Sequence, residues 1–355
     1  MILKSLRLKD FRSYPDLALT FSEGINIVEG YNGAGKTNLA EAVHYLAFAK
    51  SWRTKEAKAL IRDGAQEAYL FAEVSEGPLR REIGIRLSPA GKRITINGHP
   101  IRKLSELNDL VNVVLFSPED ATLFKGPPGD RRLFLDAAIS KASGEYLNLI
   151  SDHNRLLEER NAALKAERPD LDYLDVLTER LIAVGEPISR LRARYISRLN
   201  GTLERLATAL YGEKRSLRIV YRPFIRGENW IEEAKKAYAR SKESDLIHKA
   251  TGIGIQREDF TLLLDGKDIS LYGSQGENRL AAIALKLSPF YIVKDEGKKP
   301  IAVLDDVYSE LDAKHASRLT ALLGELRQCF VTGTNIEISG AAHIAVSGHN
   351  AFRRN

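Results

Sequence analysis

Residues 30–37 form a glycine-rich run that ends in lysine and threonine, Gly30-Tyr31-Asn32-Gly33-Ala34-Gly35-Lys36-Thr37. The run fills every fixed position of the phosphate-binding loop pattern GxxxxGK[ST]. In such a loop the glycines let the backbone curl, so that successive N–H groups at the start of a helix point at a phosphate. We expect Lys36 to reach the β and γ phosphates and the Thr37 hydroxyl to reach Mg²⁺. The sequence therefore predicts a site for a nucleoside triphosphate such as ATP.

A second set of candidate residues lies near the C-terminus, where the apolar run at 300–304 ends in Asp305 and Asp306. A hydrophobic strand that ends in paired carboxylates is typical of a Walker B motif. We expect Asp305 to hold Mg²⁺ through water, and Asp306 to act as the general base for the attacking water. The interpretation is strengthened by the segment that follows, Val307-Tyr308-Ser309-Glu310-Leu311-Asp312.

The segment upstream of these carboxylates resembles the signature loop of ABC-type ATPases, Leu271-Tyr272-Gly273-Ser274-Gln275-Gly276-Glu277. Ser274 and the Gly276 amide could bind a γ-phosphate at the N-terminus of a helix over 278–287. Alone, the loop could equally be an ordinary helix cap, but the order of the motifs is more specific than any one of them. The ABC-type resemblance implies that the signature loop of one subunit caps the ATP of another. It therefore implies two composite sites in an ATP-dependent dimer.

These motifs must be positioned by an α/β core that an insertion divides, because 238 residues separate Lys36 from Ser274. A buried strand is predicted over 25–29 and a helix over 38–46, which frame the phosphate loop. Further strands, with a tight Asn-Gly turn at 97–98, are predicted over 67–74, 79–87 and 92–96. We therefore predict an ABC-type P-loop ATPase head with an antiparallel β subdomain and an inserted helical-hairpin arm. The head takes residues 1–125 and 245–355, and the arm residues 126–244.

The arm is predicted from a change of pattern after residue 140. Apolar and asparagine side chains alternate at three- and four-residue spacing, as in a coiled-coil seam, at Leu147, Ile150, Asn154, Leu157, Asn161 and Leu164. Residues 167–170, which include Pro169, break this helix, and a second run continues over 174–206. We expect Pro187 to kink the second helix or to start a new one. The seam would be about 25 residues, or about 37 Å, long, with its register fixed by the two asparagines.

Composition limits the class of protein and of partner. The chain has 355 residues, 44% hydrophobic and 28% charged, without the run of about 18 apolar residues that a membrane span needs. No signal-peptide core is visible, and the single Cys329 excludes an intrachain disulfide and a cysteine-cluster zinc site. We therefore expect a cytoplasmic protein that contacts no membrane.

A surplus of positive charge permits a polyanionic partner. The net charge is +6, and residues 181–240 alone contain 13 Lys/Arg against 6 Asp/Glu. This surplus could be an ordinary solvated helix face or a surface that contacts a phosphate backbone. Composition favours the second interpretation only slightly.

Four segments resemble the RecF family of bacterial DNA replication and repair proteins. The third is the most specific to the family, and together the four cover nearly the full length. They are residues 8–14 (LKDFRSY); the phosphate loop through Asn38, with 50–54 (KSWRT); 116–120 (FSPED), continued by 126–136 (GPPGDRRLFLD); and 304–312 (LDDVYSELD).

This resemblance implies an ATP-dependent homodimer that binds duplex or gapped DNA, or a junction of single- and double-stranded DNA, at the nucleoid. Such a protein helps a recombinase to load, together with mediator proteins of the RecR and RecO type. The resemblance also implies that Arg12 and Asn38 contact the nucleotide. An aspartate in the base position, and Thr334 where a switch histidine would stand, are consistent with slow hydrolysis that times a clamp.

Besides the missing switch histidine, the chain departs from the expected pattern at three places. Glu277 stands where a glutamine is usual, Gln256 lies in a segment that replaces a Gly-Pro-His-Arg-Asp-like one, and no glutamine near 116–119 suits a Q-loop. Two other classes of ATPase fit the chain less well. The head of an SMC or Rad50-like protein would carry a far longer coiled coil, and the ATPase subunit of a transporter would have its signature much closer to the phosphate loop.

Overall fold

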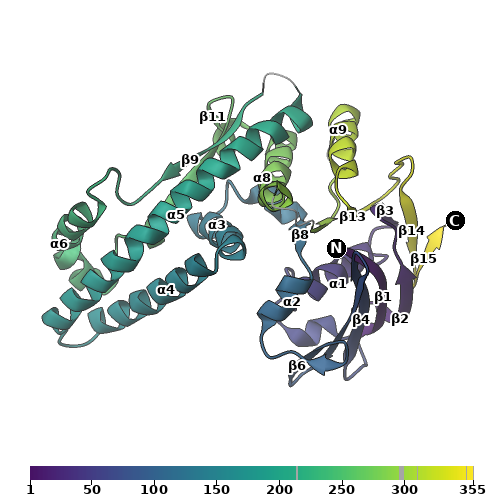
Figure 1. Ribbon diagram of the computed structural model, residues 1–355, viewed down its shortest axis with the longest axis horizontal. Helices are drawn as coiled ribbons and strands as arrows, with labels where there is room; N and C mark the ends of the chain where they lie inside the picture. Colours follow the sequence, from purple (N-terminus) through teal and green to yellow (C-terminus); the bar gives the residue numbers. More distant parts are fainter. Residues whose placement is uncertain (213–214, 296–299, 310, 349, 355) are drawn as a thin grey trace. The chain divides into compact units, whose positions relative to one another are not determined.

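The computed structural model describes residues 1–212, 215–295, 300–309, 311–348 and 350–354. The chain forms two compact units, in which unit 1 comprises Met1–Ala121, Leu206–Glu213 and Gln275–Asn355, and unit 2 comprises Thr122–Arg205 and Lys214–Ser274 (Figure 1). Unit 2 extends beyond the arm expected at 126–244, because strand β10 (Asp259–Leu264) pairs antiparallel with β9 (Leu217–Arg222), with Phe260 opposite Tyr221. Residues 245–274, which are predicted to be part of the head, therefore belong to the inserted unit.

Unit 1 contains a six-stranded sheet in the order β15-β14-β3-β13-β12-β8. All its neighbouring strands are parallel except the edge pair β14 and β15, which is antiparallel. Every residue of β12 and β13 is buried, as expected for central strands of a parallel sheet. The strands are β3 (Gly24–Glu29), β8 (Val113–Phe116), β12 (Ile301–Leu304), β13 (Gln328–Gly333), β14 (Ala342–Ser347) and β15 (Asn350–Arg354). The helices of unit 1 outside the long α5 are α1 (Lys36–Phe48), α2 (Leu104–Leu110), α8 (Gln275–Asp295) and α9 (Ala313–Gly324), with short 3-10 turns η1 (Ala57–Leu60) and η2 (Pro118–Thr122).

The predicted antiparallel subdomain is a second six-stranded sheet of unit 1, in the order β2-β1-β4-β5-β6-β7. Asn97 and Gly98 have φ angles of 50° and 79°, the left-handed backbone that a tight Asn-Gly hairpin needs. The two sheets share one hydrophobic core, which includes Leu8, Leu70 and Val28. The strands are β1 (Ile2–Phe11), β2 (Tyr14–Thr20), β4 (Ala68–Glu76), β5 (Leu79–Ser88), β6 (Gly91–Ile96) and β7 (His99–Pro100). The predicted fold class is therefore confirmed.

Unit 2 is built around a helical hairpin. Helix α4 ends at Leu164 and α5 begins at Leu171, on either side of the predicted break, and Leu156 packs against Leu177 and Leu181. The remaining elements are a three-stranded sheet in the order β11-β10-β9 and several helices. The elements are α3 (Pro128–Ala142), α4 (Gly144–Leu164), α5 (Leu171–Tyr211), β9 (Leu217–Arg222), α6 (Trp230–His248), η3 (Ile255–Arg257), β10 (Asp259–Leu264), β11 (Lys267–Asp268) and α7 (Ile269–Tyr272). None of the helices within the described residues is long and apolar enough to span a bilayer.

Helix α5 excludes one of the two alternatives for Pro187, the start of a new helix. The helix continues through this proline as one element of 41 residues, rather than restarting there. Proline removes one backbone hydrogen bond from a helix interior. The buried side chains of Ile182 and Ile188 on either side of it pack into the unit, and this packing offsets the lost bond.

The seam predicted on α4 is wrong in register. The buried side chains of this helix are Tyr146, His153, Leu156, Arg160 and Leu164, whereas Leu147 and Asn154 are exposed. The buried face is displaced because it includes an arginine and a histidine. A pattern of apolar residues cannot reveal such a face, since it counts charged side chains as exposed.

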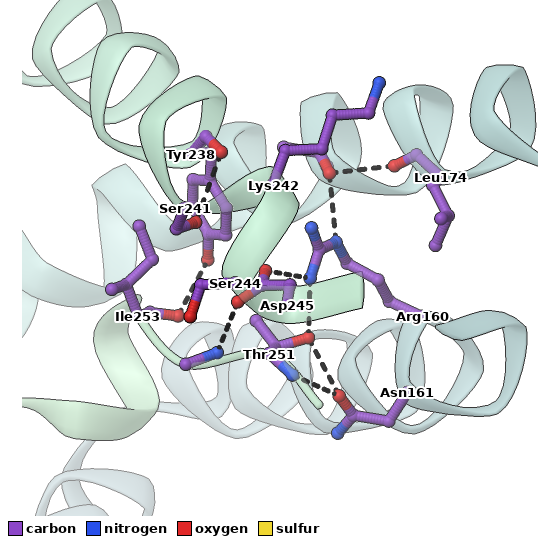
Figure 2. Close-up of polar contacts among 12 residues, drawn as sticks. Arg160, Asn161, Leu174, Tyr238, Ser241, Lys242, Ser244, Asp245, Thr251 and Ile253 are labelled. Carbon is purple, nitrogen blue, oxygen red and sulfur yellow. Dashed lines mark hydrogen bonds and ion pairs between the residues drawn. The ribbon is translucent and has the colours of Figure 1, made fainter. Parts of the chain in front are cut away.

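Arg160 is buried because a ring of acceptors surrounds it (Figure 2). Its Nη1 donates to Asp245 Oδ2 and to Thr251 Oγ1, each at 2.8 Å, and its Nε donates to Thr178 Oγ1 at 3.0 Å. Asn161 Oδ1 accepts from the Thr251 N–H at 2.8 Å. Arg160 and Asp245 both have 2% exposed side chains. The cluster joins α4, α5, α6 and the loop after α6.

Asp245→Leu is expected to destabilise unit 2 by about 3–5 kcal/mol, because it leaves the Arg160 charge buried without its partner. The double variant Arg160→Met/Asp245→Leu should recover more than half of that loss, since no unpaired charge remains. Urea unfolding followed by Trp230 fluorescence, in a Trp52→Phe background, measures both. Lys242→Ala, which breaks an exposed ion pair to Asp175, is the control and should cost less than about 1 kcal/mol. If Asp245→Leu and Lys242→Ala lowered the free energy of unfolding by similar amounts, the buried Arg160–Asp245 pair would not be important for the stability of unit 2.

Candidate nucleotide site

The phosphate loop connects the end of β3 to the first residue of α1, as the sequence predicts. At two of its positions only glycine fits, because a Cβ atom would clash with neighbouring atoms. A Cβ on Gly30 would lie 2.3 Å from the Val346 carbonyl oxygen of β14. Gly35 has a φ of 113°, and a Cβ there would lie 3.0 Å from Ser13 Oγ and from the Tyr14 hydroxyl. The neighbouring strands therefore hold the loop in its curled form.

The ammonium group of Lys36 lies within this loop. Its Nζ donates to the carbonyl oxygens of Gly30 at 2.7 Å and of Tyr31 at 2.9 Å. Partial burial lowers the pKa of Lys36, and the negative charges of Asp306 and Asp305 oppose this shift. The structure thus brings together the three residues predicted for catalysis, from two motifs at opposite ends of the chain.

Asp305 and Thr37 are in direct contact. Thr37 Oγ1 donates to Asp305 Oδ1 at 3.1 Å, and Thr332 Oγ1 donates to the same oxygen at 2.6 Å. Burial raises the pKa of Asp305, while the hydrogen bonds from Thr332 and Thr37 oppose the increase. Thr332 was not predicted as a site residue, because nothing distinguishes a threonine inside a buried strand.

The Thr37 hydroxyl and the Asp305 carboxylate are a donor set that fits Mg²⁺. Mg²⁺ prefers hard oxygen ligands and is usually bound by one or two protein groups, together with substrate phosphates and water. Among the residues that the structure describes, no group of three or more His, Cys, Asp or Glu side chains could hold a metal by itself. The Thr37–Asp305 pair beside the phosphate loop suits a Mg²⁺ ion whose other ligands are phosphates and water.

Asp306 directly follows, with an exposed side chain and a left-handed backbone (φ 49°). This conformation costs a residue with a Cβ about 1 kcal/mol or more. Its N–H donates to Thr332 Oγ1 at 3.0 Å, and its carbonyl oxygen accepts from Arg279 Nη1 at 2.9 Å and from Ser309 Oγ at 3.1 Å. Asp306 and Thr334 line the same cavity of about 580 Å³. Glu310, part of the predicted SELD segment, lies outside the described residues.

Arg12 and Asn38, expected as nucleotide contacts, are linked by two residues that the sequence reasoning missed. Arg12 forms a two-pronged ion pair with the fully buried Glu41, at 2.7 and 2.8 Å. Arg53 Nη1 donates to Asn38 Oδ1 at 2.8 Å and lies 3.3 Å from Glu41. Arg53 lies in the KSWRT segment that resembles the family, but no signal in the sequence marks Glu41. The buried carboxylate orients both guanidinium groups beside the phosphate loop.

The signature loop stands at the start of α8. This helix begins at Gln275, three residues earlier than predicted, so that Gly276 lies in its first turn and Ser274 directly precedes it. Ser274 is exposed. The Glu277 carbonyl accepts a hydrogen bond from the Tyr211 hydroxyl at 2.7 Å, a contact made by its backbone rather than by its carboxylate.

The FSPED segment follows the end of β8, and its Asp120 contacts α8. Asp120 Oδ2 accepts from the Ser117 N–H at 2.9 Å, and its Oδ1 pairs with Lys286 at 2.9 Å. The aspartate thus links residues 116–120, where a Q-loop would be expected in an ABC-type ATPase, to the signature helix α8. Together with Arg279, it fixes α8 to the nucleotide end of the parallel sheet.

The most family-specific segment, residues 126–136, takes part in ion pairs of unit 2 that are buried or partly buried. Arg131 pairs with Asp259 at 2.8 Å, and Arg192 pairs with Asp136 at 2.9 Å and with Glu258 at 2.7 Å. Arg192 is 2% exposed, so it does not contribute to a surface within the basic stretch 181–240. These contacts give the segment, and the neighbours of Gln256, a structural explanation.

Comparisons with known proteins are consistent along the whole chain. The family described as RecF/RecN/SMC N terminal domain matches residues 2–348. A DNA replication and repair protein RecF from Lactobacillus johnsonii is 34% identical, over 95% of this chain and 93% of its own. One from Lachnoclostridium phytofermentans is 36% identical, over 95% and 94% respectively.

Solved structures give the same result. The recombination mediator protein RecF with ATP, in the RecFOR pathway, has a TM-score of 0.85 at 30% identity and covers 99% of both chains. An Smc head domain from Pyrococcus furiosus has a TM-score of 0.60 at 17% identity, over 99% of this chain and 95% of its own, and shares the fold alone.

Proposed function

Since the chain belongs to the RecF family of DNA replication and repair proteins, we propose that it is an ATPase that binds DNA as an ATP-dependent homodimer. The observation that best supports the ATPase activity is the 3.1 Å hydrogen bond between Thr37 and Asp305. It joins the phosphate loop to the end of β12. The contact places the proposed Mg²⁺ ligands next to Lys36 and Asp306. A loop, a cation, a hydroxyl and two carboxylates in this arrangement suit the β and γ phosphates of ATP.

The mechanism follows from these positions. The loop amides and Lys36 would bind the phosphates, and Mg²⁺ on Thr37 and Asp305 would neutralise charge on them. Asp306, exposed at the strand end, would accept a proton from the water whose oxygen attacks the γ-phosphorus, while the bond to the ADP oxygen breaks. The products are ADP and phosphate. With an aspartate as the base and Thr334 beside it, we propose slow turnover that times the release of a clamp.

The proposed dimer places the exposed Ser274 of one copy at the ATP of the other. ATP would therefore join two subunits, and hydrolysis would separate them. The basic net charge of +6 suits DNA as the partner, at gaps, single-strand/double-strand junctions or damaged duplex in the nucleoid of the cytoplasm. The RecFOR pathway named for its structural relatives supports RecR- and RecO-type mediators as further partners.

Asp306→Asn is expected to leave the Kd for ATP within about threefold and to slow hydrolysis about 100-fold or more, because it removes the proton acceptor and keeps the shape. Asparagine tolerates the left-handed backbone, so the substitution adds no strain. Equilibrium binding and steady-state phosphate release measure the two effects, with the exposed Asp63→Asn as the control. The variant should accumulate as an ATP-bound dimer. If the variant hydrolyses ATP at the wild-type rate, Asp306 is not the general base and only supports the position of Asp305.

DNA binding with ATP, with ADP and without nucleotide tests the proposed function. Duplex, gapped and single-stranded DNA are compared by fluorescence anisotropy, while sedimentation follows the oligomeric state. We expect dimers and the tightest DNA binding with ATP, and monomers with ADP. Equal affinity in all three nucleotide states would contradict the ATP-dependent clamp.

A further inference from the structure

The backbone of Asp306 is fixed by three side chains from three parts of unit 1. Thr332 of β13 accepts its N–H, while Ser309 and Arg279 donate to its carbonyl oxygen. These bonds hold the residue in a left-handed conformation, which is less favourable for a residue with a Cβ than helical or extended backbone. The orientation of the proposed base therefore depends on its neighbours.

Arg279 is the most distant of these neighbours in sequence, 27 residues from Asp306. It is 4% exposed and lies in the second turn of α8, five residues after Ser274. Besides the Asp306 carbonyl, its Nη1 contacts the Val307 carbonyl at 3.4 Å and Ser309 Oγ at 3.1 Å. One guanidinium group thus contacts Asp306, Val307 and Ser309, all in the segment that follows the Walker B strand.

We propose that Arg279 is a positioning residue for Asp306, and that it makes the orientation of the base depend on the signature helix α8. The inference rests on the proposed role of Asp306 in hydrolysis. Arg279 does not touch the reacting atoms and acts through the Asp306 backbone. Because α8 starts next to Ser274, displacement of the signature loop by a second subunit's nucleotide would reach Arg279, and through it the base of the same chain. Each composite site would thereby sense the other.

Arg279→Gln is expected to lower kcat between about 10-fold and 100-fold, the range expected when a reacting group is misplaced by about 1 Å. The KM and the Kd for ATP should change less than about threefold, because Lys36 and the loop are untouched. Arg279→Lys keeps the charge and one donor, and should recover part of kcat. Ser309→Ala removes the other donor to the same carbonyl and should lower kcat in the same direction by a smaller factor.

The matched control is Arg318→Gln. Arg318 also donates to a backbone carbonyl of unit 1, that of Tyr211, but has no contact with Asp306 in the structure. Its kcat should stay within about twofold of wild type. If Arg279→Gln does not fold, as judged by circular dichroism, Arg279→Lys and Ser309→Ala still carry the test. Wild-type kcat in both of these would overturn the proposal.

A double-mutant cycle with Asp306→Asn separates this inference from the proposed function. If Arg279 acts through Asp306, the double variant Arg279→Gln/Asp306→Asn hydrolyses ATP no more slowly than Asp306→Asn alone. A further 10-fold loss would show that Arg279 acts elsewhere, and would refute the inference. Wild-type hydrolysis by Asp306→Asn would instead refute the proposed base itself. If Asp306→Asn hydrolyses ATP slowly but Arg279→Gln hydrolyses it at the wild-type rate, the inference about Arg279 is refuted and the proposed base is not.

Discussion

Lys36→Ala is expected to abolish ATP binding, because it removes the positive charge predicted to face the β and γ phosphates. The ammonium group lies within the loop, 2.7 Å from the Gly30 carbonyl oxygen. Lys36→Arg should retain some binding and lose hydrolysis, since a planar guanidinium cannot occupy the position of a point charge. Equilibrium binding of a fluorescent ATP analogue and phosphate release measure the two steps.

The exposed Lys58→Ala is the control for loss of a lysine, and should bind ATP as the wild type does. Circular dichroism and thermal unfolding establish that Lys36→Ala is folded. Normal hydrolysis in Lys36→Ala would show that residues 30–37 are not the phosphate site.

Ser274→Arg should give a protein that binds ATP as a monomer, but neither dimerises nor hydrolyses it. The phosphate loop of the same chain is untouched, whereas a bulky guanidinium at the start of α8 would block closure on a second subunit. DNA affinity should fall if only the dimer completes the basic surface, and its salt dependence should become shallower because fewer phosphates are neutralised. Sedimentation with ATP and DNA titrations at several salt concentrations measure these changes. Ser151→Arg, at an exposed position on α4, is the control.

Mixing Ser274→Arg with Lys36→Ala gives the sharper result. One of the two composite sites in a mixed dimer then pairs an intact phosphate loop with an intact signature loop. Partial recovery of hydrolysis would support action in trans. If mixed dimers form and no hydrolysis returns, either the site is built within one chain or both sites must act together.

The phosphate loop and the Walker B strand could be recognised from the sequence because their requirements are local. A strand, a run of glycines, a lysine and a helix start within 20 residues of one another, and the fold class followed from their order. The RecF resemblance also proved correct, which disfavours the transporter and SMC alternatives. The roles of Lys36, Asp305 and Ser274 remain predictions for the variants above.

What the sequence could not provide are contacts between distant segments. Thr332 reaches Asp305 across 27 residues and Arg12 reaches Glu41 across 29, and no motif couples these pairs. The register error on α4 has a similar origin, because the buried Arg160 pairs with Asp245, which lies 85 residues away. Buried charges become visible only when the partner's position is known.

The pairing of β3 sets an order of events during protein synthesis. The strand that leads into the phosphate loop has Cys329 opposite Ile25 on one side and His343 opposite Ile27 on the other. About 300 residues must therefore leave the ribosome before both neighbours exist, which takes about 15 to 60 s at 5–20 residues per second. All residues of unit 2 precede Gln275 and emerge earlier. A nascent chain thus carries its phosphate loop long before both strands that flank β3 have been made.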